Sequence, residues 1–230
     1  MLIGPQNLTA NVNHVRSRIT QAARAAGRDP ATVTLVAVTK AKAAEFVRAA
    51  ATAGVTDFGE NYLQEALGKM DELGALPVCW HFIGALQSNK TRAVAERFDW
   101  VHSIDRLSVA RRLSEQRPFH ARPLNLCIQV ALVPEPTKRG VEPSGLPELA
   151  RQTAQLPRVR LRGLMCIPPP QPDVRSEREA FSRLRSLLEE LNATGLELDT
   201  LSMGMSADFE SAIAEGATHV RIGTAIFGSR

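Results

Sequence analysis

One lysine stands where a buried strand is predicted to end. The run Leu35–Thr39 is short, apolar and rich in β-branched residues, and Lys40 follows it directly. Such a run is typical of a strand that is buried on both faces of a parallel sheet. Barrels keep their chemistry at the carboxyl ends of such strands, and a lysine amine there can form an imine with a carbonyl group. Lys40 is therefore a candidate nucleophile, although this run alone fits a solvated loop lysine more simply.

Two glycine-containing segments near the C-terminus indicate an anion site. Met203–Asp208 and Arg221–Gly228 each follow or end a predicted strand. In a barrel, the loops after strands seven and eight commonly bind phosphate, because glycines let the backbone approach and a helix start offers free N–H groups. Ser206 and Thr224 can add hydroxyl groups, while Arg221 adds a permanent charge for a phosphate oxygen or a ring nitrogen. Ser206 alone could equally be a helix N-cap.

The elements that must position these residues alternate along the whole chain. Helical spacing of apolar residues from Leu8 to Ile19 predicts a leading helix that closes at Gly27. Strand-like runs then recur at intervals of roughly 20 to 40 residues, separated by helical stretches, as in repeated βα units. These runs cover residues 35–39, 57–59, 80–84, 100–104, 124–130, 164–167, 200–203 and 219–222.

Eight such strands predict a single (β/α)8 TIM barrel with a leading N-terminal helix. The expected domain is residues 1–230, because no change in composition marks a linker and barrels of about 200 to 250 residues are often single units. An open doubly wound sheet is the alternative, but it would need fewer strands or a clear switch point. The loop 134–140, rich in proline and charge, is expected to be exposed.

Composition narrows the classes of function. The net charge of +4 is dispersed, and only two tryptophans and one tyrosine could stack on bases, so we expect no nucleic-acid partner. The three cysteines show no C-x-x-C spacing and are expected to be buried and reduced. The first residues lack a basic leader and no apolar run reaches the length of a membrane span, so a cytoplasmic protein without a membrane partner is expected. No histidine spacing indicates a metal site.

Lys40 and the phosphate segments would face each other across the barrel mouth, because strand eight neighbours strand one in a closed barrel. A phosphorylated aldehyde would satisfy both groups. Pyridoxal 5′-phosphate (PLP) needs a lysine for its imine, a cradle for its phosphate and a group near its ring nitrogen. PLP is therefore the candidate cofactor.

At this point the sequence resembles the pyridoxal phosphate homeostasis protein family, and the resemblance runs through essentially the whole chain. The segments that carry it are Val36–Lys40, Phe58–Tyr62, Trp80–Gly84, Leu86–Lys90, Arg162–Met165, Leu201–Ser206 and Val220–Gly228. The resemblance implies a fold-type III barrel related to the N-terminal domain of alanine racemase. It also implies a carrier or buffer that takes part in intracellular PLP (vitamin B6) and amino-acid homeostasis without catalysis.

The same resemblance implies roles for individual residues. Lys40 is expected to hold PLP as a Schiff base. The residues expected around the phosphate and ring are Asn61, Ser206, Arg221, Gly223 and Thr224, with Met203, Gly204 and Lys138 as further candidates. His81 is a further candidate from its position on a predicted strand, where its side chain can point into the barrel, and it fits a satisfied core histidine at least as well as a ligand contact. Lys138 matches a lysine suspected of a secondary PLP contact, and its loop is unlike the usual version of the family.

Three other functions stay open on the sequence. A PLP-dependent amino-acid racemase would need a second base on the opposite face of the cofactor, which alanine racemases take from a domain that this chain lacks. A class I aldolase would use Lys40 without PLP, and an interaction module would leave the lysine and the phosphate segments without a role. PLP-dependent apo-enzymes are potential partners, and the open mouth of a barrel would permit a monomer.

Overall fold

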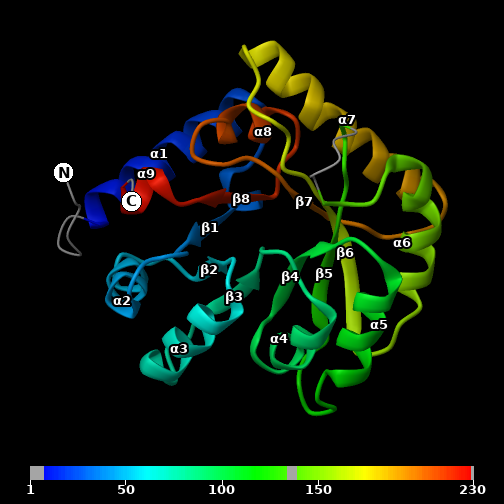
Figure 1. The fold of residues 1–230 in the computed structure, drawn as a ribbon. Helices are drawn as coiled ribbons and strands as arrows, with labels where there is room; N and C mark the ends of the chain where they lie inside the picture. The colour runs from blue at the N-terminus through cyan, green and yellow to red at the C-terminus, as the bar shows by residue number, and fades with distance from the viewer. Residues whose placement is uncertain (1–7, 134–138, 229–230) are drawn as a thin grey trace.

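Parallel strands close into a barrel with helices packed around it (Figure 1). The computed structural model describes residues 8–133 and 139–228. The strands are β1 Thr34–Val38, β2 Asp57–Glu60, β3 Cys79–Phe82, β4 Trp100–Ile104, β5 Leu124–Gln129, β6 Val159–Met165, β7 Thr200–Ser202 and β8 His219–Ile222. The helices are α1 Leu8–Ala25, α2 Ala44–Thr52, α3 Leu63–Leu73, α4 Thr91–Arg97, α5 Leu107–Gln116, α6 Leu146–Ala154, α7 Val174–Ala193, α8 Phe209–Ala214 and α9 Thr224–Phe227. Short 3₁₀ turns cover Pro30–Thr32, Ser88–Lys90 and Pro143–Gly145.

Closure of the barrel confirms the predicted (β/α)8 architecture. Each strand pairs in parallel with the next along the chain, and β1 pairs with β8, where Val36 lies opposite Arg221. Helical crossovers between successive strands require this parallel arrangement. The pairing of β1 with β8 brings the segment after Val38 next to the segment after Ile222. The two chemical regions expected from the sequence therefore share one end of the barrel.

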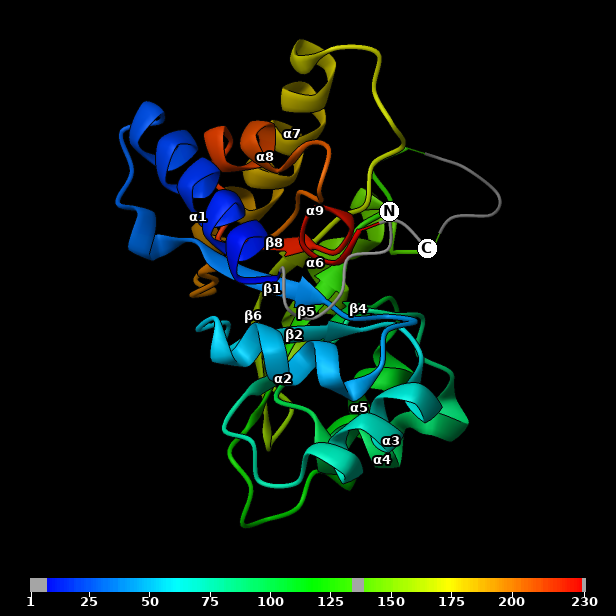
Figure 2. The same ribbon diagram turned by 90° about the vertical axis from the view of Figure 1, so that its left-hand side faces the viewer.

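The leading helix α1 packs beside α8 and α9 (Figures 1 and 2). Its apolar positions from Leu8 to Ile19 are buried, as the helical spacing predicts. Two polar contacts fix its place: Asn11 donates its side-chain amide to the carbonyl of Ile226 at 2.9 Å, and Arg18 makes a forked ion pair with Glu210 at 2.7 and 2.9 Å. Helix α1 thus supports the short α9 that follows β8.

The interior of the barrel holds aromatic rings as well as aliphatic side chains. His81 on β3 stacks on Trp100 of β4 with ring centroids 5.6 Å apart and planes 8° from parallel. His102 and His219 pack edge-on nearby, with centroids 5.9 Å apart. The three histidines are buried. A barrel of eight strands has room for side chains but no open channel, and here part of that space is filled by imidazoles.

Two boundaries differ from the expected ones. Strand β6 begins at Val159 rather than Leu164, because its first half alternates apolar residues with Arg160 and Arg162 and lacks the continuous apolar run used to find the other strands. Helix α8 begins at Phe209 rather than Ser206, because residues 206–208 form a turn closed by the Asp208 carboxylate, which accepts from the Met205 N–H at 2.6 Å.

One local expectation also needs correction. Asp105, which follows the predicted strand 100–104, is of a residue type that favours a helix N-cap, but the N-cap of α5 is Arg106, and the Asp105 carboxylate accepts from Arg106 Nη1 at 2.5 Å. Helix α6, between β5 and β6, buries Leu146 and Leu149 at helical spacing. Pro147 in its first turn has the backbone angle that a helix start requires. Of the predicted loop 134–140, residues 134–138 lie outside the described residues.

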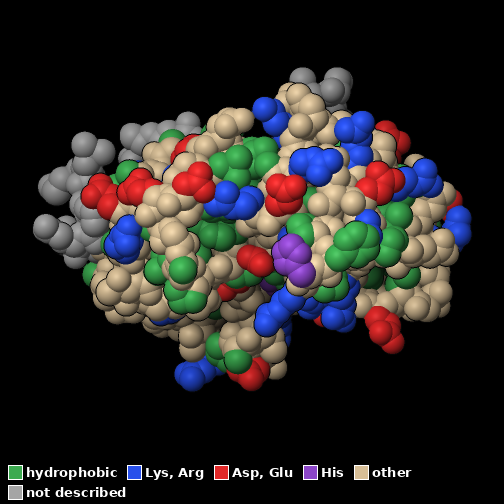
Figure 3. Space-filling view, turned by 90° about the horizontal axis from the view of Figure 1, so that it is seen from below, with side chains coloured by type: hydrophobic (Ala, Val, Ile, Leu, Met, Phe, Trp, Pro, Cys, Tyr) green, Lys and Arg blue, Asp and Glu red, His purple; other side chains and the backbone are tan. Residues whose placement is uncertain are grey.

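Basic and acidic side chains are interspersed on the face seen in Figure 3, with apolar patches between them. On this face the basic side chains form no continuous stripe. The expectation of no nucleic-acid partner stays a prediction. Among the residues that the structure describes, no helix is both long enough and apolar enough to cross a bilayer.

Candidate functional site

Lys40 lies just beyond β1, at the carboxyl end of the barrel. The residue is exposed and lines a cavity of about 570 Å³. That volume lies within the range of about 300 to 1,000 Å³ that small-molecule pockets span. The cavity brings Lys40 together with residues from the loops after β2, β7 and β8. The predicted meeting of the lysine and the C-terminal segments is therefore present.

The backbone on both sides of Lys40 is held from helix α3. The Ala41 N–H donates to Glu65 Oε1 at 2.5 Å, and Lys69 Nζ donates to the Thr39 carbonyl at 2.5 Å. Ala41 has a φ of +58°, in the left-handed region that costs a non-glycine residue roughly 1 to 2 kcal/mol. These contacts hold a strained turn whose middle residue is the candidate nucleophile.

Glu60 and Lys69 form a buried ion pair beneath that turn. Glu60 Oε1 accepts from Lys69 Nζ at 2.7 Å and from Thr39 Oγ1 at 2.5 Å. Burial raises the pKa of Glu60, and its contacts with Lys69 and Thr39 only partly oppose that effect. Glu60 does not line the cavity at Lys40. Its contacts make it a support for the turn rather than a base in the cavity.

Ser206, Gly223 and Thr224 line the same cavity as Lys40. Ser206 Oγ accepts from the Ala225 N–H at 3.3 Å, so it links the β7 loop to the first turn of α9. A side chain at Gly223 would place its Cβ 3.3 Å from the Val38 carbonyl oxygen, which is tighter than ordinary packing. The sequence interpretation of Ser206 as the N-cap of α8 is wrong, because that helix begins three residues later.

Arg221 forms the floor of the cavity. It is buried, and its guanidinium donates through Nη1 to Ser202 Oγ at 2.7 Å and through Nη2 to the Cys166 carbonyl at 2.9 Å. Burial lowers the pKa of the guanidinium, although arginine stays charged at any ordinary pH. A fixed positive charge therefore faces the cavity from strand β8, below the hydroxyls of the loops.

Met203 and Gly204 do not line the cavity; they shape its wall from behind. Both are buried, and the Gly204 carbonyl accepts from the Arg221 N–H at 3.0 Å. Gly204 has a φ of +93°, and an added Cβ would lie 2.6 Å from the Ala212 Cβ. Only glycine fits this close approach between the β7 loop and α8.

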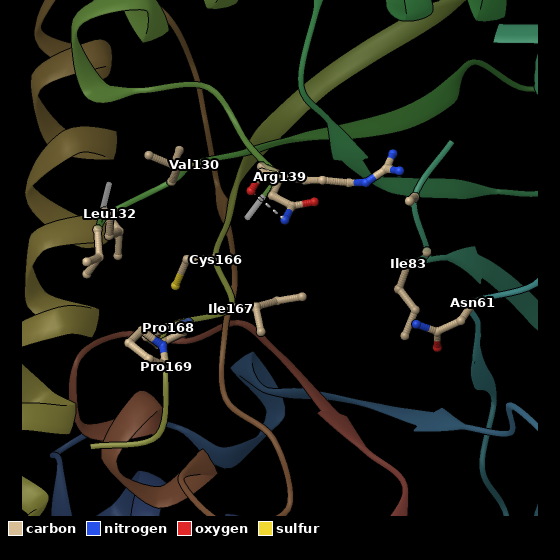
Figure 4. Close-up of a pocket in the computed structure, with 14 residues that line it drawn as sticks. Asn61, Ile83, Val130, Leu132, Arg139, Cys166, Ile167, Pro168 and Pro169 are labelled. Carbon is tan, nitrogen blue, oxygen red and sulfur yellow. Dashed lines mark hydrogen bonds between the residues drawn. The ribbon is translucent and has the colours of Figure 1, made fainter. Parts of the chain in front are cut away.

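Asn61 lies between the main cavity and a second one of about 310 Å³. Asn61, Ile83 and Ile167 line both, so the two cavities adjoin. Figure 4 shows Asn61 and Ile83 on one side of the smaller cavity, facing Ile167 across it. Asn61 Oδ1 is buried and has no hydrogen-bond partner among the described residues. An amide oxygen in this state is a ready acceptor for a bound molecule.

Two further candidates have different outcomes: one lies away from both cavities, and the other is outside the described residues. His81 lines neither cavity, because its ring turns into the barrel and hydrogen-bonds to Asp57 and His102 at 3.0 and 2.9 Å. Lys138 lies outside the described residues. Lys42 also lines the main cavity, and its Nζ donates to the Phe227 carbonyl at 3.0 Å.

Several apolar wall residues were not singled out from the sequence. Their side chains cannot be recognised by chemical type, and only the folded barrel assigns them to the cavity. They are Val38, Ile83, Ile167, Met205 and Phe227.

Asp57, Cys79 and His81 bring potential metal-ligating atoms within 4.8 Å of one another at the other end of the barrel. The His81 Nε2 atom is engaged with Asp57 at 3.0 Å, and burial is the main cause that raises the pKa of the Cys79 thiol. A thiol that resists deprotonation is a poor metal ligand. The sequence-based expectation of no metal site stays a prediction.

Comparison with known proteins places this geometry in a family. Residues 5–230 match the model of the alanine racemase N-terminal domain. The chain is 60% identical over 223 residues to the pyridoxal phosphate homeostasis protein of Pseudomonas aeruginosa, covering 97% of this chain and 96% of that protein. It is 48% identical over 227 residues to the Escherichia coli protein of the same name, covering 97% of each chain.

Solved structures agree with these relatives. PipY of Synechococcus elongatus, in a structure with PLP bound, is 39% identical and superposes with a TM-score of 0.85 over 96% of this chain and all of PipY. Alanine racemase of Corynebacterium glutamicum is 18% identical, with a TM-score of 0.73 over 98% of this chain and 62% of the racemase, and shares the barrel fold. The resemblance seen in the sequence is confirmed: the chain belongs to the pyridoxal phosphate homeostasis protein family.

Proposed function

We propose that the chain binds PLP reversibly in the cavity at Lys40 and acts as a carrier or buffer of the cofactor in PLP and amino-acid homeostasis. The observation that carries the proposal is the placement of an accessible lysine, two loop hydroxyls and a buried arginine around one cavity. PLP supplies an aldehyde that bonds reversibly to an amine, together with a phosphate and a ring nitrogen. The PLP-bound PipY structure supports the same cofactor for this chain.

The residues of the cavity fit the three parts of PLP. Lys40 supplies the amine that holds the aldehyde carbon as a Schiff base. Ser206, Gly223 and Thr224 would surround the phosphate, because they lie in the loop segments where barrels bind phosphate. Asn61 has a free buried oxygen on the cavity wall, so it can accept a hydrogen bond from the cofactor.

Arg221 fits the ring nitrogen better than the phosphate. Its guanidinium lies on the cavity floor on strand β8, where Ser202 and Cys166 hold it, whereas the loop hydroxyls lie beyond the strand ends. A permanently charged donor keeps a ring nitrogen unprotonated, which weakens the capacity of PLP to accept electrons from a substrate. A weakened electron sink is consistent with poor catalysis.

A racemase is the alternative function, and the cavity lacks what it needs. Among the described residues that line it, the titratable groups are Lys40, Lys42 and Arg221, with no carboxylate, histidine or tyrosine. Lys42 is tied to the Phe227 carbonyl. We therefore expect no exchange of amino-acid α-protons in D2O with the PLP-loaded protein; rapid exchange of one amino acid would establish an enzyme instead.

Absorbance spectroscopy tests the proposal directly. Protein titrated with PLP should develop a visible band that borohydride removes, because reduction converts the imine to an amine. Lys40→Ala should lose the band, while the matched variant Lys42→Ala, altered at the other lysine of the cavity, should keep it. A native protein that gives no band with PLP would contradict the proposal and would favour the aldolase-like use of Lys40.

We further infer one barrel domain over residues 1–230, a monomer in the cytoplasm, and transfer of PLP to PLP-dependent apo-enzymes. The single family match over residues 5–230 supports the first, and the accessibility of Lys40 supports exchange with other proteins. Light scattering tests the monomer. The recovery of activity by a PLP-dependent apo-enzyme tests transfer. Recovery should be faster from the PLP-loaded protein than from free PLP at an equal free concentration.

A further inference from the structure

A chain of hydrogen bonds crosses the barrel interior and ends at the arginine of the cavity floor. Asp57 Oδ1 lies 3.0 Å from His81 Nε2, and His81 Nδ1 lies 2.9 Å from His102 Nε2. His102 Nδ1 lies 2.7 Å from Ser202 Oγ, and Ser202 Oγ accepts from Arg221 Nη1 at 2.7 Å. This hydrogen-bond chain therefore joins five strands, β2, β3, β4, β7 and β8, and runs from the amino end of β2 to the proposed PLP site.

When both imidazoles are neutral, the two ends of this hydrogen-bond chain fix the direction of every bond within it. Arg221 can only donate, so the Ser202 oxygen must accept from it, which leaves the serine hydroxyl proton for His102 Nδ1. A carboxylate can only accept, so His81 Nε2 must carry a proton toward Asp57. Neutral imidazoles then satisfy all four contacts in one arrangement: Nε2–H on both rings, with Nδ1 as the acceptor on both.

The surroundings of His102 favour a neutral ring. Burial lowers the pKa of His102 well below its usual range, and positive charge at His81, His219 and Arg221 would lower it further. Burial alone would raise the pKa of Asp57, but hydrogen bonds with His81 and Thr56, together with positive charge at His81 and His219, outweigh burial and lower it. The other groups that face the histidines are Trp100, which stacks on His81, and the ring of His219.

We propose that His81 and His102, as neutral Nε2–H tautomers, position the Arg221 guanidinium through the hydroxyl of Ser202. His102 takes the serine proton, so the serine oxygen presents its lone pair to Arg221; without His102 the hydroxyl can rotate its proton toward the guanidinium. This role of Arg221 toward the cofactor rests on the proposed PLP function. The tautomers themselves do not.

The tautomers can be measured without PLP. Two-dimensional NMR of the apo-protein labelled with 15N-histidine distinguishes protonated from unprotonated ring nitrogens, and the chain has five histidines to assign. His81→Gln and His102→Gln identify the two resonances by their loss. We expect Nδ1 unprotonated and Nε2 protonated on both rings at pH 7. An Nδ1–H tautomer or an imidazolium at either ring would overturn the proposed chain.

A matched pair of variants tests the positioning role. His102→Asn keeps an acceptor near the former Nδ1 position, facing Ser202, but cannot reach His81. His102→Gln keeps a donor facing His81 but leaves Ser202 without its acceptor. We expect His102→Gln and Ser202→Ala to weaken PLP binding by roughly tenfold or more, the order expected for one hydrogen bond to a charged group, and to shift the absorbance maximum of bound PLP. His102→Asn should lose less PLP affinity than His102→Gln, and its bound PLP should keep an absorbance maximum closer to that of the native protein.

The outcomes separate the two proposals. If the native protein does not bind PLP, the proposed function fails while the NMR result still decides the tautomers. If the native protein binds PLP and all three variants match its affinity and spectrum, the positioning role is overturned. Equal losses in His102→Asn and His102→Gln would also overturn it, because such losses would reflect packing alone.

Discussion

The mouth and the interior of the barrel are built from the same strands, but their polar groups differ in exposure and in hydrogen bonding. At the carboxyl end, Lys40 and Thr224 are exposed beside a cavity. In the interior, His81, His102 and Ser202 are buried, and each has two hydrogen-bond partners. A binding site needs polar groups that can still form hydrogen bonds with a ligand. A buried polar group instead needs its hydrogen-bond partners from the protein itself. Arg221 belongs to both regions and connects them.

The largest expected effect is a loss of folding stability in acid, caused by the buried histidines of the interior. Burial is the main cause that lowers the pKa of His219 to about 3, and burial also lowers the pKa of His102, whereas an unfolded histidine titrates near about 6.5. Between these values the unfolded chain binds more protons, so stability falls as the pH falls. At pH 4, His219 alone should cost on the order of 3 kcal/mol relative to pH 7. Glu60 acts in the opposite direction, because its raised pKa favours the folded state in acid.

Urea unfolding between pH 7 and pH 4 measures this loss. His219→Asn should flatten the pH dependence, while His14→Asn, on the exposed face of α1, should leave it unchanged. Two results would contradict the assignment of a neutral buried ring: a native protein whose free energy of unfolding does not change over this pH range, or a His219→Asn variant with the same pH dependence as the native protein.

Removing Lys69 should destabilise the support beneath the cavity by at least a similar amount. In Lys69→Met the buried Glu60 carboxylate loses the partner that lies 2.7 Å away, and breaking a buried pair on one side typically costs about 3 to 5 kcal/mol. The free energy of unfolding in urea at pH 7 should fall by that amount. The double variant Glu60→Gln/Lys69→Met removes both charges and should regain much of the loss. Two results would contradict this role of the ion pair: Lys69→Met as stable as the native chain, or a double variant no more stable than Lys69→Met.

Gly204→Ala should have a smaller effect on the wall of the cavity. The added Cβ would lie 2.6 Å from the Ala212 Cβ at a φ of +93°, and overpacking of this kind costs about 1 to 3 kcal/mol. Gly74→Ala is the control, because Gly74 also has a positive φ, +58°, but nothing lies within 4 Å of its Cβ position. Thermal unfolding should show a larger loss for Gly204→Ala than for Gly74→Ala. Equal losses would mean that backbone strain alone matters at Gly204.

The contrast between the mouth and the interior also marks what the sequence could predict. Lys40, Ser206, Gly223 and Thr224 follow strands whose apolar runs are recognisable, and the parallel topology brings those strand ends together. The pairing of His81 with His102 joins strands 21 residues apart, and its geometry depends on the stagger of the barrel. Sequence reasoning allowed that His81 points into the barrel but had no signal for its partners.

Local errors have similarly local causes. The start of β6 was missed because Arg160 and Arg162 interrupt its apolar pattern, and Arg162 is needed outside the core, where it pairs with Asp199 at 2.7 Å. The Lys69–Glu60 pair was missed because a lysine on a helix is ordinarily exposed. In both cases a tertiary partner overrides the expectation for the residue type.

The most direct test of the account is to find which lysine carries PLP. Protein loaded with PLP, reduced with borohydride and digested should be mapped by mass spectrometry. The account predicts the added pyridoxyl phosphate on Lys40, with Lys42 and Lys69 unmodified at stoichiometric PLP. Modification that falls on other lysines while Lys40 stays free would contradict the assignment of the barrel mouth as the cofactor site.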